Sequence, residues 1–258
     1  MFSLEGKVCV VVGCSQGIGL GIVERFVEAG ATVVMGTRSP KAQEIADRLG
    51  CLFVQTDVSK EADVENLMKK AHEKHGDLDV VINNAGILIP EESFADMDYK
   101  NFRWAFDVNV DGCMYGIKYG QKYMKDGGSI IITSSVGGAM PYFEGYGAYC
   151  ATKAAMISMT KTAAIELAKR RIAVNCVLPG TIDTPMAHGE GADMELALNS
   201  LIHPVGRMGT VDEIVPLYHF LASGECSFMT GSIIACDGGF LAGPNNEALE
   251  KVIPHLAE

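Results

Sequence analysis

The sequence has no long apolar run and no surplus of basic residues. Its longest apolar stretches fall well short of the roughly 20 residues that a membrane-spanning helix needs. With 21 lysines and arginines against 32 aspartates and glutamates, the chain lacks the basic patches that bind nucleic acid. Its first seven residues have neither the basic start nor the apolar segment of a signal peptide. We therefore expect a cytoplasmic protein that binds neither membranes nor nucleic acid.

The sequence also lacks the cysteine pattern of metal and redox sites. None of its eight cysteines forms a Cys-x-x-Cys pair. Five of them lie in apolar strand-like or helix-like runs, where cysteine behaves as a small hydrophobe. We predict buried, reduced thiols and no metal site. Cys14 and Cys150 differ from the others because each adjoins a candidate site.

No linker, repeat or low-complexity tract divides the chain. The 258 residues suffice for one α/β domain with a continuous core, so we expect a single domain over residues 1–258. Strand-like and helix-like segments alternate throughout. This alternation predicts a parallel sheet with right-handed crossovers and helices on both faces.

The first sixty residues read as two strand–helix units. Residues 7–12 are an apolar, β-branched run that predicts a buried strand. The glycine-rich turn Gly13-Cys-Ser-Gln-Gly17-Ile-Gly19 follows, then a helical pattern over residues 20–29, ended by Gly30. Glycines allow a ligand to approach the backbone, and the helix N-terminus favours a phosphate. The context predicts dinucleotide binding rather than a plain turn.

Tyr149 is the only tyrosine with a lysine, Lys153, four residues later. That spacing places both side chains on one face of a helix. An ammonium beside a phenol lowers the phenol pKa from about 10. A phenol that ionises near neutral pH is a general acid or base. A solvated helix face can carry such a pair by chance, so the interpretation depends on the motifs around it.

Those motifs resemble the short-chain dehydrogenase/reductase family of classical type. The resemblance covers roughly residues 5–240 and rests on seven motifs in the family's order. They are the glycine turn, Asp57-Val58, Asn83-Asn84-Ala85-Gly86, Asn109, the Tyr149–Lys153 pair, Pro179-Gly180 with Thr184, and Asp237-Gly238-Gly239. The resemblance implies a Rossmann-type, doubly wound parallel sheet of about seven strands and an NAD(P)-dependent oxidoreductase.

It also implies roles for individual residues. Tyr149 would exchange a proton with the substrate, and Lys153 would lower its pKa and hold the nicotinamide ribose. Asn109 would bend its helix and anchor a water that relays protons to Lys153. The coenzyme would contact Gly13, Ser15, Gln16, Gly17, Ile18, Gly19, Thr37, Arg38, Ser39, Asp57, Val58, Asn83, Ala85, Gly86, Tyr149, Lys153, Pro179, Gly180, Ile182 and Thr184.

Two serines end an apolar strand-like run, Ser134 and Ser135. A hydroxyl at the carboxyl end of a strand can donate a hydrogen bond to a substrate oxygen. We assign that role to Ser135 and a turn-forming role to Ser134. Ser135 lies one position farther from Tyr149 than the family commonly has, which implies one extra residue in the loop 136–148.

The substrate side is largely apolar and aromatic. The segments expected to line it contain Met140, Pro141, Tyr142, Phe143, Tyr146 and Met186, with residues 87–89 opposite and Glu144 and His188 as ionisable groups. We expect Ser135, Tyr142, Phe143, Tyr146 and Met186 to contact a bulky hydrophobic ketone or secondary alcohol, alicyclic or steroid-like. These aromatic residues would also suit loop packing. Residues 194–202 resemble a flap over the site.

The end of the second strand predicts the coenzyme. A carboxylate there would bind the adenosine ribose 2′-hydroxyl and repel a 2′-phosphate. The chain has Thr37, Arg38 and Ser39 instead. Arg38 can form a bidentate contact with the phosphate. We predict that NADP(H) is preferred and that NAD(H) can be used.

Two other functions remain open. A 3-oxoacyl-[acyl-carrier-protein] reductase of the same family would need basic residues near its mouth. Lys169, Arg170 and Arg171 could serve, although Asp126 and the net charge of −11 are unfavourable. A catalytically silent NAD(P)-binding sensor would keep the glycines but typically lose Tyr149 or Lys153.

The resemblance also implies a homo-oligomer, a dimer or tetramer, built on the helices over 114–124 and 154–167. The segment from Asp237 to Glu258, with Leu249, Val252, Ile253 and Leu256, could reach a neighbouring subunit.

Overall fold

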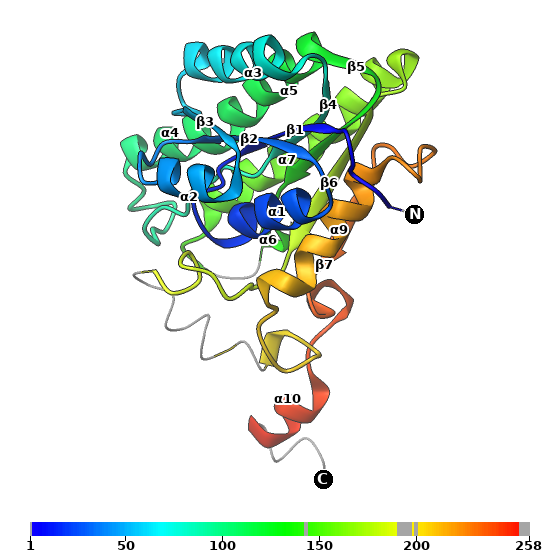
Figure 1. Cartoon of the computed structure of the whole chain (residues 1–258). Coiled ribbons are helices and arrows are strands. Elements are labelled where there is room, and N and C mark those ends of the chain that lie inside the picture. The colour runs from blue at the N-terminus through cyan, green and yellow to red at the C-terminus, as the bar shows by residue number, and fades with distance from the viewer. Residues whose placement is uncertain (1, 142–143, 190–197, 199–200, 253–258) are drawn as a thin grey trace.

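The structure, a computed structural model, describes residues 2–141, 144–189, 198 and 201–252. Its centre is a seven-stranded sheet in the order β3-β2-β1-β4-β5-β6-β7, and every neighbouring pair is parallel. The strands are β1 Val8–Val12, β2 Thr32–Thr37, β3 Leu52–Gln55, β4 Leu78–Asn83, β5 Met124–Thr133, β6 Ala173–Pro179 and β7 Ile233–Cys236. The predicted doubly wound, Rossmann-type α/β fold is confirmed (Figure 1).

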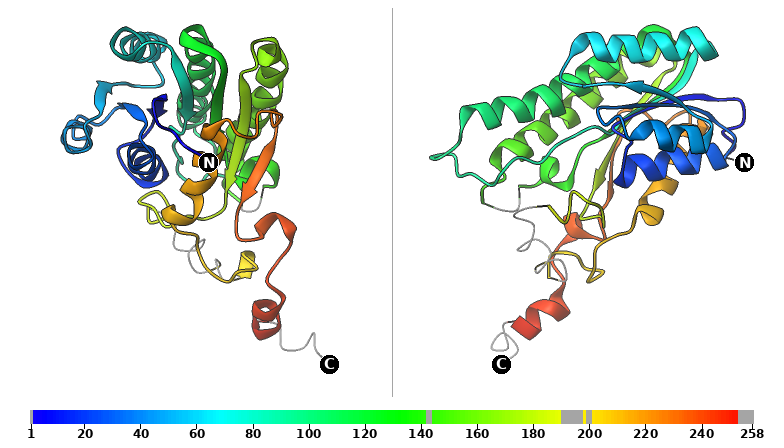
Figure 2. Two further views of the ribbon diagram at one scale, coloured as in Figure 1. Left: turned by 45° about the vertical axis from the view of Figure 1, so that its right-hand side comes forward. Right: turned by 60° about the vertical axis from the view of Figure 1, so that its left-hand side comes forward.

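Helices connect successive strands and cover both faces of the sheet. The α-helices are α1 Gly17–Glu28, α2 Ala42–Leu49, α3 Glu61–His75, α4 Tyr99–Phe106, α5 Gly112–Tyr123, α6 Val136–Ala139, α7 Gly147–Leu167, α9 Val211–Ser223 and α10 Asn246–Val252. A π-helical turn, η1 Asp107–Asp111, joins α4 to α5, and short 3₁₀ turns lie at η2 Ala168–Arg170 and η3 Phe240–Ala242. Figure 2 shows α3, α5 and α7 together on one side of the sheet.

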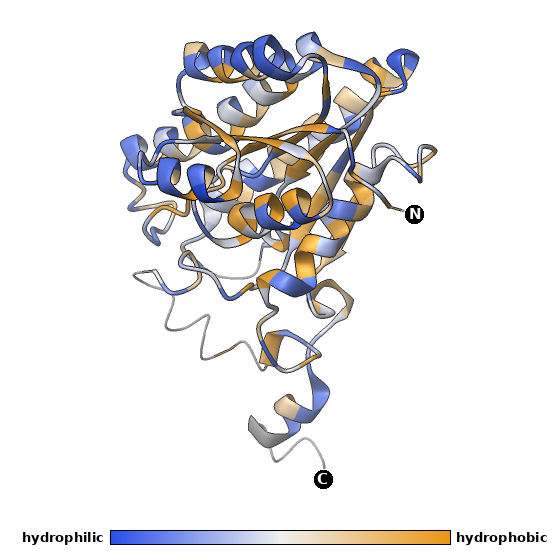
Figure 3. Ribbon diagram, in the orientation of Figure 1, coloured by the Kyte–Doolittle hydropathy of each residue, from blue (hydrophilic) through white to orange (hydrophobic). Residues whose placement is uncertain are grey.

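The core is divided in two because side chains alternate along each strand. On β1, Val8, Val10 and Val12 belong to one apolar cluster, with residues of α3, α5 and α7. Cys9 and Val11 belong to the other, with residues of α1, α2 and α9. Figure 3 shows the hydrophobic strands between helices whose outer turns are hydrophilic. Burial on both faces explains why these strands are continuous apolar runs.

The strand order reverses beside β1, since β2 lies on one side of it and β4 on the other. In such a sheet the crevice beyond the carboxyl ends of the strands is where ligands bind. The turns after β1 to β6 carry many of the predicted site residues, and α7 and η1 carry Tyr149, Lys153 and Asn109. The fold therefore gathers segments that are distant in the sequence at one edge.

All eight cysteines are free, and Cys9, Cys14, Cys113, Cys150 and Cys176 are buried. No group of three potential metal ligands occurs among the described residues. Within the same part of the chain, no helix combines the length and apolarity needed to cross a membrane.

Candidate active site

The glycine turn after β1 is built for close backbone approach. Gly13 has φ of +80°, and its N–H donates to the Gly36 carbonyl at 2.7 Å. A Cβ on Gly13 would lie 2.4 Å from the Cα of Ala85, and one on Gly19 would lie 2.1 Å from the Gly13 carbonyl oxygen. No other residue type fits these positions without a shift of the backbone. The turn leads into α1 at Gly17, so helix N–H groups face the crevice.

Residues of the turn after β4 hold the glycine turn. The side-chain amide of Asn84 donates to the Gly13 carbonyl at 2.8 Å. Ala85 is the residue that Gly13 touches. The side chain of Asn83 instead faces α5, where a Cβ on Gly116 would lie 1.9 Å from its Oδ1. The Asn83 side chain therefore packs against α5.

The ends of β2 and β3 form the part of the crevice that is expected to hold the adenosine. Thr37 Oγ1 lies 3.4 Å from Ser15 Oγ of the glycine turn, and the Gln55 amide donates to the Arg38 carbonyl at 3.2 Å. Asp57 accepts hydrogen bonds from the backbone and hydroxyl of Ser59. These contacts fix the backbone around the predicted coenzyme-selecting residue Arg38.

Lys153 is buried beside Tyr149. Its Nζ lies 5.6 Å from the centroid of the Tyr149 ring and donates to the Thr133 carbonyl at 3.1 Å. Burial in this apolar surrounding lowers the pKa of Lys153 from 10.5 to about 8. The predicted pair therefore does face one side of α7, but the lysine is a core residue rather than part of a solvated surface.

Asn109 lies in the π-helical turn η1 and is completely buried. Its Oδ1 accepts from the Ile87 N–H at 2.8 Å, and its Nδ2 donates to the Ile87 carbonyl and to Thr152 Oγ1, each at 3.0 Å. A Cβ on Gly86 would lie 3.2 Å from Lys153 Nζ and 3.3 Å from Asn109 Oδ1. The asparagine thus joins the turn after β4 to α7, close to the lysine ammonium.

The two serines after β5 have different environments. Ser134 donates from its hydroxyl to the Lys153 carbonyl at 2.8 Å, which ties the end of the strand to α7. Ser135 begins α6, and its hydroxyl oxygen accepts from the Gly137 N–H at 3.1 Å. The Ser135 hydroxyl proton is not used by that contact, so it can be donated to a ligand.

The turn after β6 extends toward the glycine turn. A Cβ on Gly17 would lie 3.2 Å from the Thr184 methyl carbon, and Thr184 Oγ1 donates to the Ile182 carbonyl at 3.1 Å. Gly180 approaches Asp237, since a Cβ there would lie 2.8 Å from the Asp237 Cα. The Pro179-Gly180 turn and the late Asp237 turn are therefore neighbours.

The expected substrate wall is only partly described by the structure. Tyr142 and Phe143 lie outside the described residues, as does most of the expected flap over 194–202. Met140 and Met186 are exposed, whereas Tyr146 is buried. Ile89 packs in a small cluster with Ala105 and Ala148, and His188 is 2.8 Å from Asp183. Met140 and Met186 have the exposure that a ligand-facing residue needs.

Sequence reasoning missed two contributors to this site. The Thr133 carbonyl receives the lysine ammonium, and the Thr152 hydroxyl accepts from Asn109 and donates to the Tyr149 carbonyl at 2.7 Å. A backbone carbonyl has no sequence signal. Thr152 had one, since it lies between Tyr149 and Lys153 where a helical side chain can reach the preceding turn.

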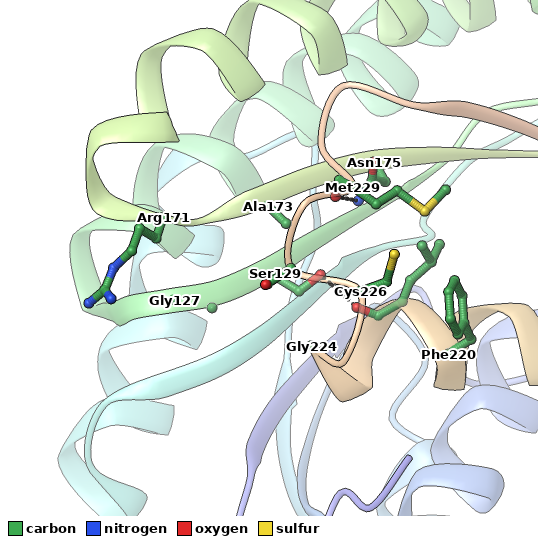
Figure 4. Close-up of a pocket in the computed structure, with 12 residues that line it drawn as sticks. Gly127, Ser129, Arg171, Ala173, Asn175, Phe220, Gly224, Cys226 and Met229 are labelled. Atoms are coloured by element: carbon green, nitrogen blue, oxygen red, sulfur yellow. Dashed lines mark hydrogen bonds between the residues drawn. The ribbon is translucent and has the colours of Figure 1, made fainter. Parts of the chain in front are cut away.

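The basic residues Lys169, Arg170 and Arg171 precede β6. They therefore lie at the amino ends of the strands, whereas Tyr149 lies at the carboxyl ends. Arg170 is held by Asp126 at 2.9 Å and by the carbonyls of Gln121 and Met124. Arg171 lines a cavity of about 30 Å³ at that edge, with Ser129, Asn175 and Met229 (Figure 4). None of the predicted site residues that the structure describes lines this cavity, and it is far smaller than a dinucleotide needs.

Known proteins resemble the chain over nearly its whole length. The profile of a family described as enoyl-(acyl carrier protein) reductase matches residues 13–241. A cis-4-hydroxycyclohexanecarboxylate dehydrogenase from Sinomonas cyclohexanicum is 35% identical over 92% of this chain and 97% of its own. An NADP-dependent (R)-specific alcohol dehydrogenase from Lentilactobacillus kefiri is 38% identical over 93% of this chain and 98% of its own.

Solved structures agree with this relationship. A short-chain type dehydrogenase/reductase from Mycobacterium marinum superimposes with a TM-score of 0.87 at 34% identity, covering 93% of this chain and 97% of that one. A short-chain dehydrogenase/reductase from Serratia marcescens gives a TM-score of 0.85 at 31% identity, covering 92% and 98%.

Proposed function

The chain belongs to the short-chain dehydrogenase/reductase family of oxidoreductases, and on that premise we propose that it interconverts a secondary alcohol and a ketone with NADP(H). The observation that carries the proposal is the buried Lys153 ammonium beside the Tyr149 ring, 5.6 Å away. A sensor without chemistry would have no need to keep a lysine in the core, because burying its charge is costly.

The glycine turn suits the coenzyme that this chemistry requires. A Cβ at Gly13 or Gly19 would overlap neighbouring backbone, so these glycines let the turn pack tightly in front of α1. The N–H groups at the N-terminus of α1 would then bind a pyrophosphate. Lys153 and the turn after β6 would hold the nicotinamide half. A bound nicotinamide supplies or accepts the hydride.

The protein's own residues manage the proton. Tyr149 donates its phenolic proton to the carbonyl oxygen during reduction and takes a proton from the alcohol during oxidation. The Lys153 ammonium stabilises the phenolate that forms. Ser135 donates its hydroxyl proton in a hydrogen bond to the same substrate oxygen. Asn109 holds the turn after β4 in place through its contacts with Ile87 and lies beside the lysine, where it can order a water for proton transfer.

Three features support the finer assignments. Arg38, without an acidic residue beside it at the end of β2, favours a coenzyme with a 2′-phosphate, and the Lentilactobacillus relative is NADP-dependent by its name. The exposed Met140 and Met186 favour a bulky hydrophobic substrate, and the Sinomonas relative is named for an alicyclic one. Free cysteines throughout the chain agree with a reducing, cytoplasmic environment.

The acyl-carrier-protein reductase is the weaker candidate. Its acidic partner would need basic residues around the entrance to the site. The basic group Lys169–Arg171 precedes β6, at the other edge of the sheet, and Arg170 is engaged by Asp126. An acidic carrier would also be repelled by the net charge of −11.

Steady-state kinetics with a panel of alicyclic and steroid-like ketones tests the proposal. We expect kcat/KM to be higher with NADPH than with NADH, and a clear preference for NADH would refute the coenzyme assignment.

Tyr149→Phe should lower kcat by about 10²–10⁴-fold because the general acid is lost, while the Kd for NADPH stays nearly unchanged. Tyr123→Phe, on α5, is the matched control. Near-native kcat in Tyr149→Phe at saturating substrate would contradict the mechanism.

A further inference from the structure

The chain has a single tryptophan, Trp104, which the proposed mechanism does not use. It lies on α4 with 37% of its surface exposed. The guanidinium carbon of Arg38, from the end of β2, lies 5.9 Å from the centroid of its ring. That distance is within the range of a cation–π contact, for which tryptophan is the best aromatic partner. Two segments far apart in sequence therefore meet through this pair.

The contact lies at the adenosine end of the crevice. Val108, one helical turn after Trp104, belongs to the same apolar cluster as Val58, the apolar residue that follows β3. Gly112, at the start of α5, packs against Val58, since a Cβ there would lie 2.9 Å from the Val58 Cβ. Gln55 anchors the Arg38 carbonyl from β3. Trp104 thus lies against Arg38, the residue predicted to select the coenzyme.

The charges around Arg38 leave its N–H groups available. Asp107 is the carboxylate nearest to Trp104 along the helix, and it pairs with Arg103 at 2.9 Å. Within the described part of the chain, no ion pair involves Arg38. A guanidinium can stack its flat face on an indole while its in-plane N–H groups bind a phosphate. The indole therefore orients Arg38 without competing for the donors that a phosphate would use.

We propose that Trp104 is a positioning residue for coenzyme specificity, which holds the Arg38 guanidinium where it meets the adenosine 2′-phosphate. This inference rests on the proposed NADP(H) preference. It assigns part of that preference to a residue on α4, outside the strand end where coenzyme choice is usually decided.

Two coenzyme fragments isolate the effect, because 2′,5′-ADP carries the 2′-phosphate and 5′-AMP does not. In calorimetric titrations of the whole protein, Trp104→Ala should weaken 2′,5′-ADP binding by about two- to five-fold, the range of an exposed cation–π contact, and leave 5′-AMP binding unchanged. Trp104→Phe should weaken 2′,5′-ADP binding less than Trp104→Ala does. Tyr99→Ala, which removes an exposed aromatic ring from the same helix, is the matched control.

The pair is tested directly by a double-mutant cycle. In an Arg38→Ala background, Trp104→Ala should have no further effect on 2′,5′-ADP binding. In the unmodified protein, 2′,5′-ADP should also change the tryptophan fluorescence more than 5′-AMP does. If the unmodified protein binds the two fragments equally, the proposed coenzyme preference and this inference both fail. If it prefers 2′,5′-ADP and Trp104→Ala keeps the full preference, only this inference is overturned.

Discussion

At the scale of single residues, Lys153 links stability to activity. Its pKa is lowered by burial from 10.5 to about 8. Between these two values the unfolded chain binds more protons than the folded chain, so the free energy of unfolding increases with pH across that window. Below pH 8 the full penalty for burying the ammonium is present, and it corresponds to about 3 kcal/mol. Above pH 10.5 the lysine is neutral in both states, and the penalty disappears.

We therefore expect Lys153→Met to inactivate the enzyme and yet to stabilise it without coenzyme at pH 7. Removing the buried charge should stabilise the protein, and leaving the Thr133 carbonyl without its partner should offset part of that gain. The net gain in the free energy of unfolding should be about 1–3 kcal/mol. It should shrink as the pH rises from 8 to 10.5. Urea unfolding of both proteins at several pH values measures the difference. Lys161→Met, on the exposed side of α7, should change stability by less than about 0.5 kcal/mol at every pH. A variant that is less stable than the parent at pH 7 would contradict this account.

The sequence predicted the residues whose spacing carries information and missed those that act through the backbone. The spacing of Tyr149 and Lys153 places them on one face of a helix, and the motifs around them made the pair a candidate site. Ser134 was expected only to form a turn, and its hydroxyl donates to the Lys153 carbonyl on α7. The Thr133 carbonyl could not be predicted, because every residue has one. The contact between Arg38 and Trp104 depends on how β2 and α4 pack, which no local pattern specifies.

At the scale of elements, the position of the proposed catalytic pair, Tyr149 and Lys153, depends on the close packing of α6 on α7. A Cβ on Gly138 of α6 would lie 2.6 Å from the Lys153 carbonyl carbon and 2.8 Å from its oxygen. These are backbone atoms of a long helix and cannot move aside as a side chain could. The two helices can approach this closely only because Gly138 has no side chain.

Gly138→Ala should consequently push α6, and with it Ser135, away from Lys153. We expect a loss of about 1–3 kcal/mol of stability, typical of overpacking, and a lower kcat with little change in the Kd for NADPH. Gly189→Ala is the control, since among the residues that the structure describes a Cβ there would meet only the Met186 carbonyl, at 3.4 Å. Thermal unfolding and steady-state kinetics of both variants decide the point. Native stability and kcat in Gly138→Ala would show that the helices adjust without cost.

The strands were the most predictable elements and the short helices the least. A strand buried on both faces has to be a continuous apolar run, as β1 is. The four residues of α6, Val-Gly-Gly-Ala, have no helical pattern and low helix propensity; packing against α7 forms that turn. The resemblance implied a bend at Asn109, and the structure has a π-helical turn there, held by the hydrogen bonds of Asn109 to Ile87.

At the scale of the whole molecule, α5 and α7 present apolar side chains outward. Ile165 on α7 is 78% exposed and Met114 on α5 is also exposed. The neighbouring polar residues of α5 are engaged with α3, through Lys118–Glu61 and Lys122–Glu65 pairs. At the other end of the chain, α10 stands away from the body of the protein in all three views (Figures 1 and 2). Both features suit contacts with further copies of the chain.

We accordingly propose that the protein is a dimer or tetramer whose subunits meet through α5 and α7. Sedimentation velocity at micromolar concentration should detect the oligomer. Ile165→Glu combined with Met114→Glu should dissociate it into smaller species, because two charges would be buried without partners. Phe228→Glu, at a fully exposed apolar residue in the loop after α9, should leave the sedimentation coefficient unchanged and serves as the control. A monomer in the unmodified protein would refute the proposed assembly. An oligomer that survives the double substitution would instead show that its subunits meet through another surface, with α10 as the next segment to delete.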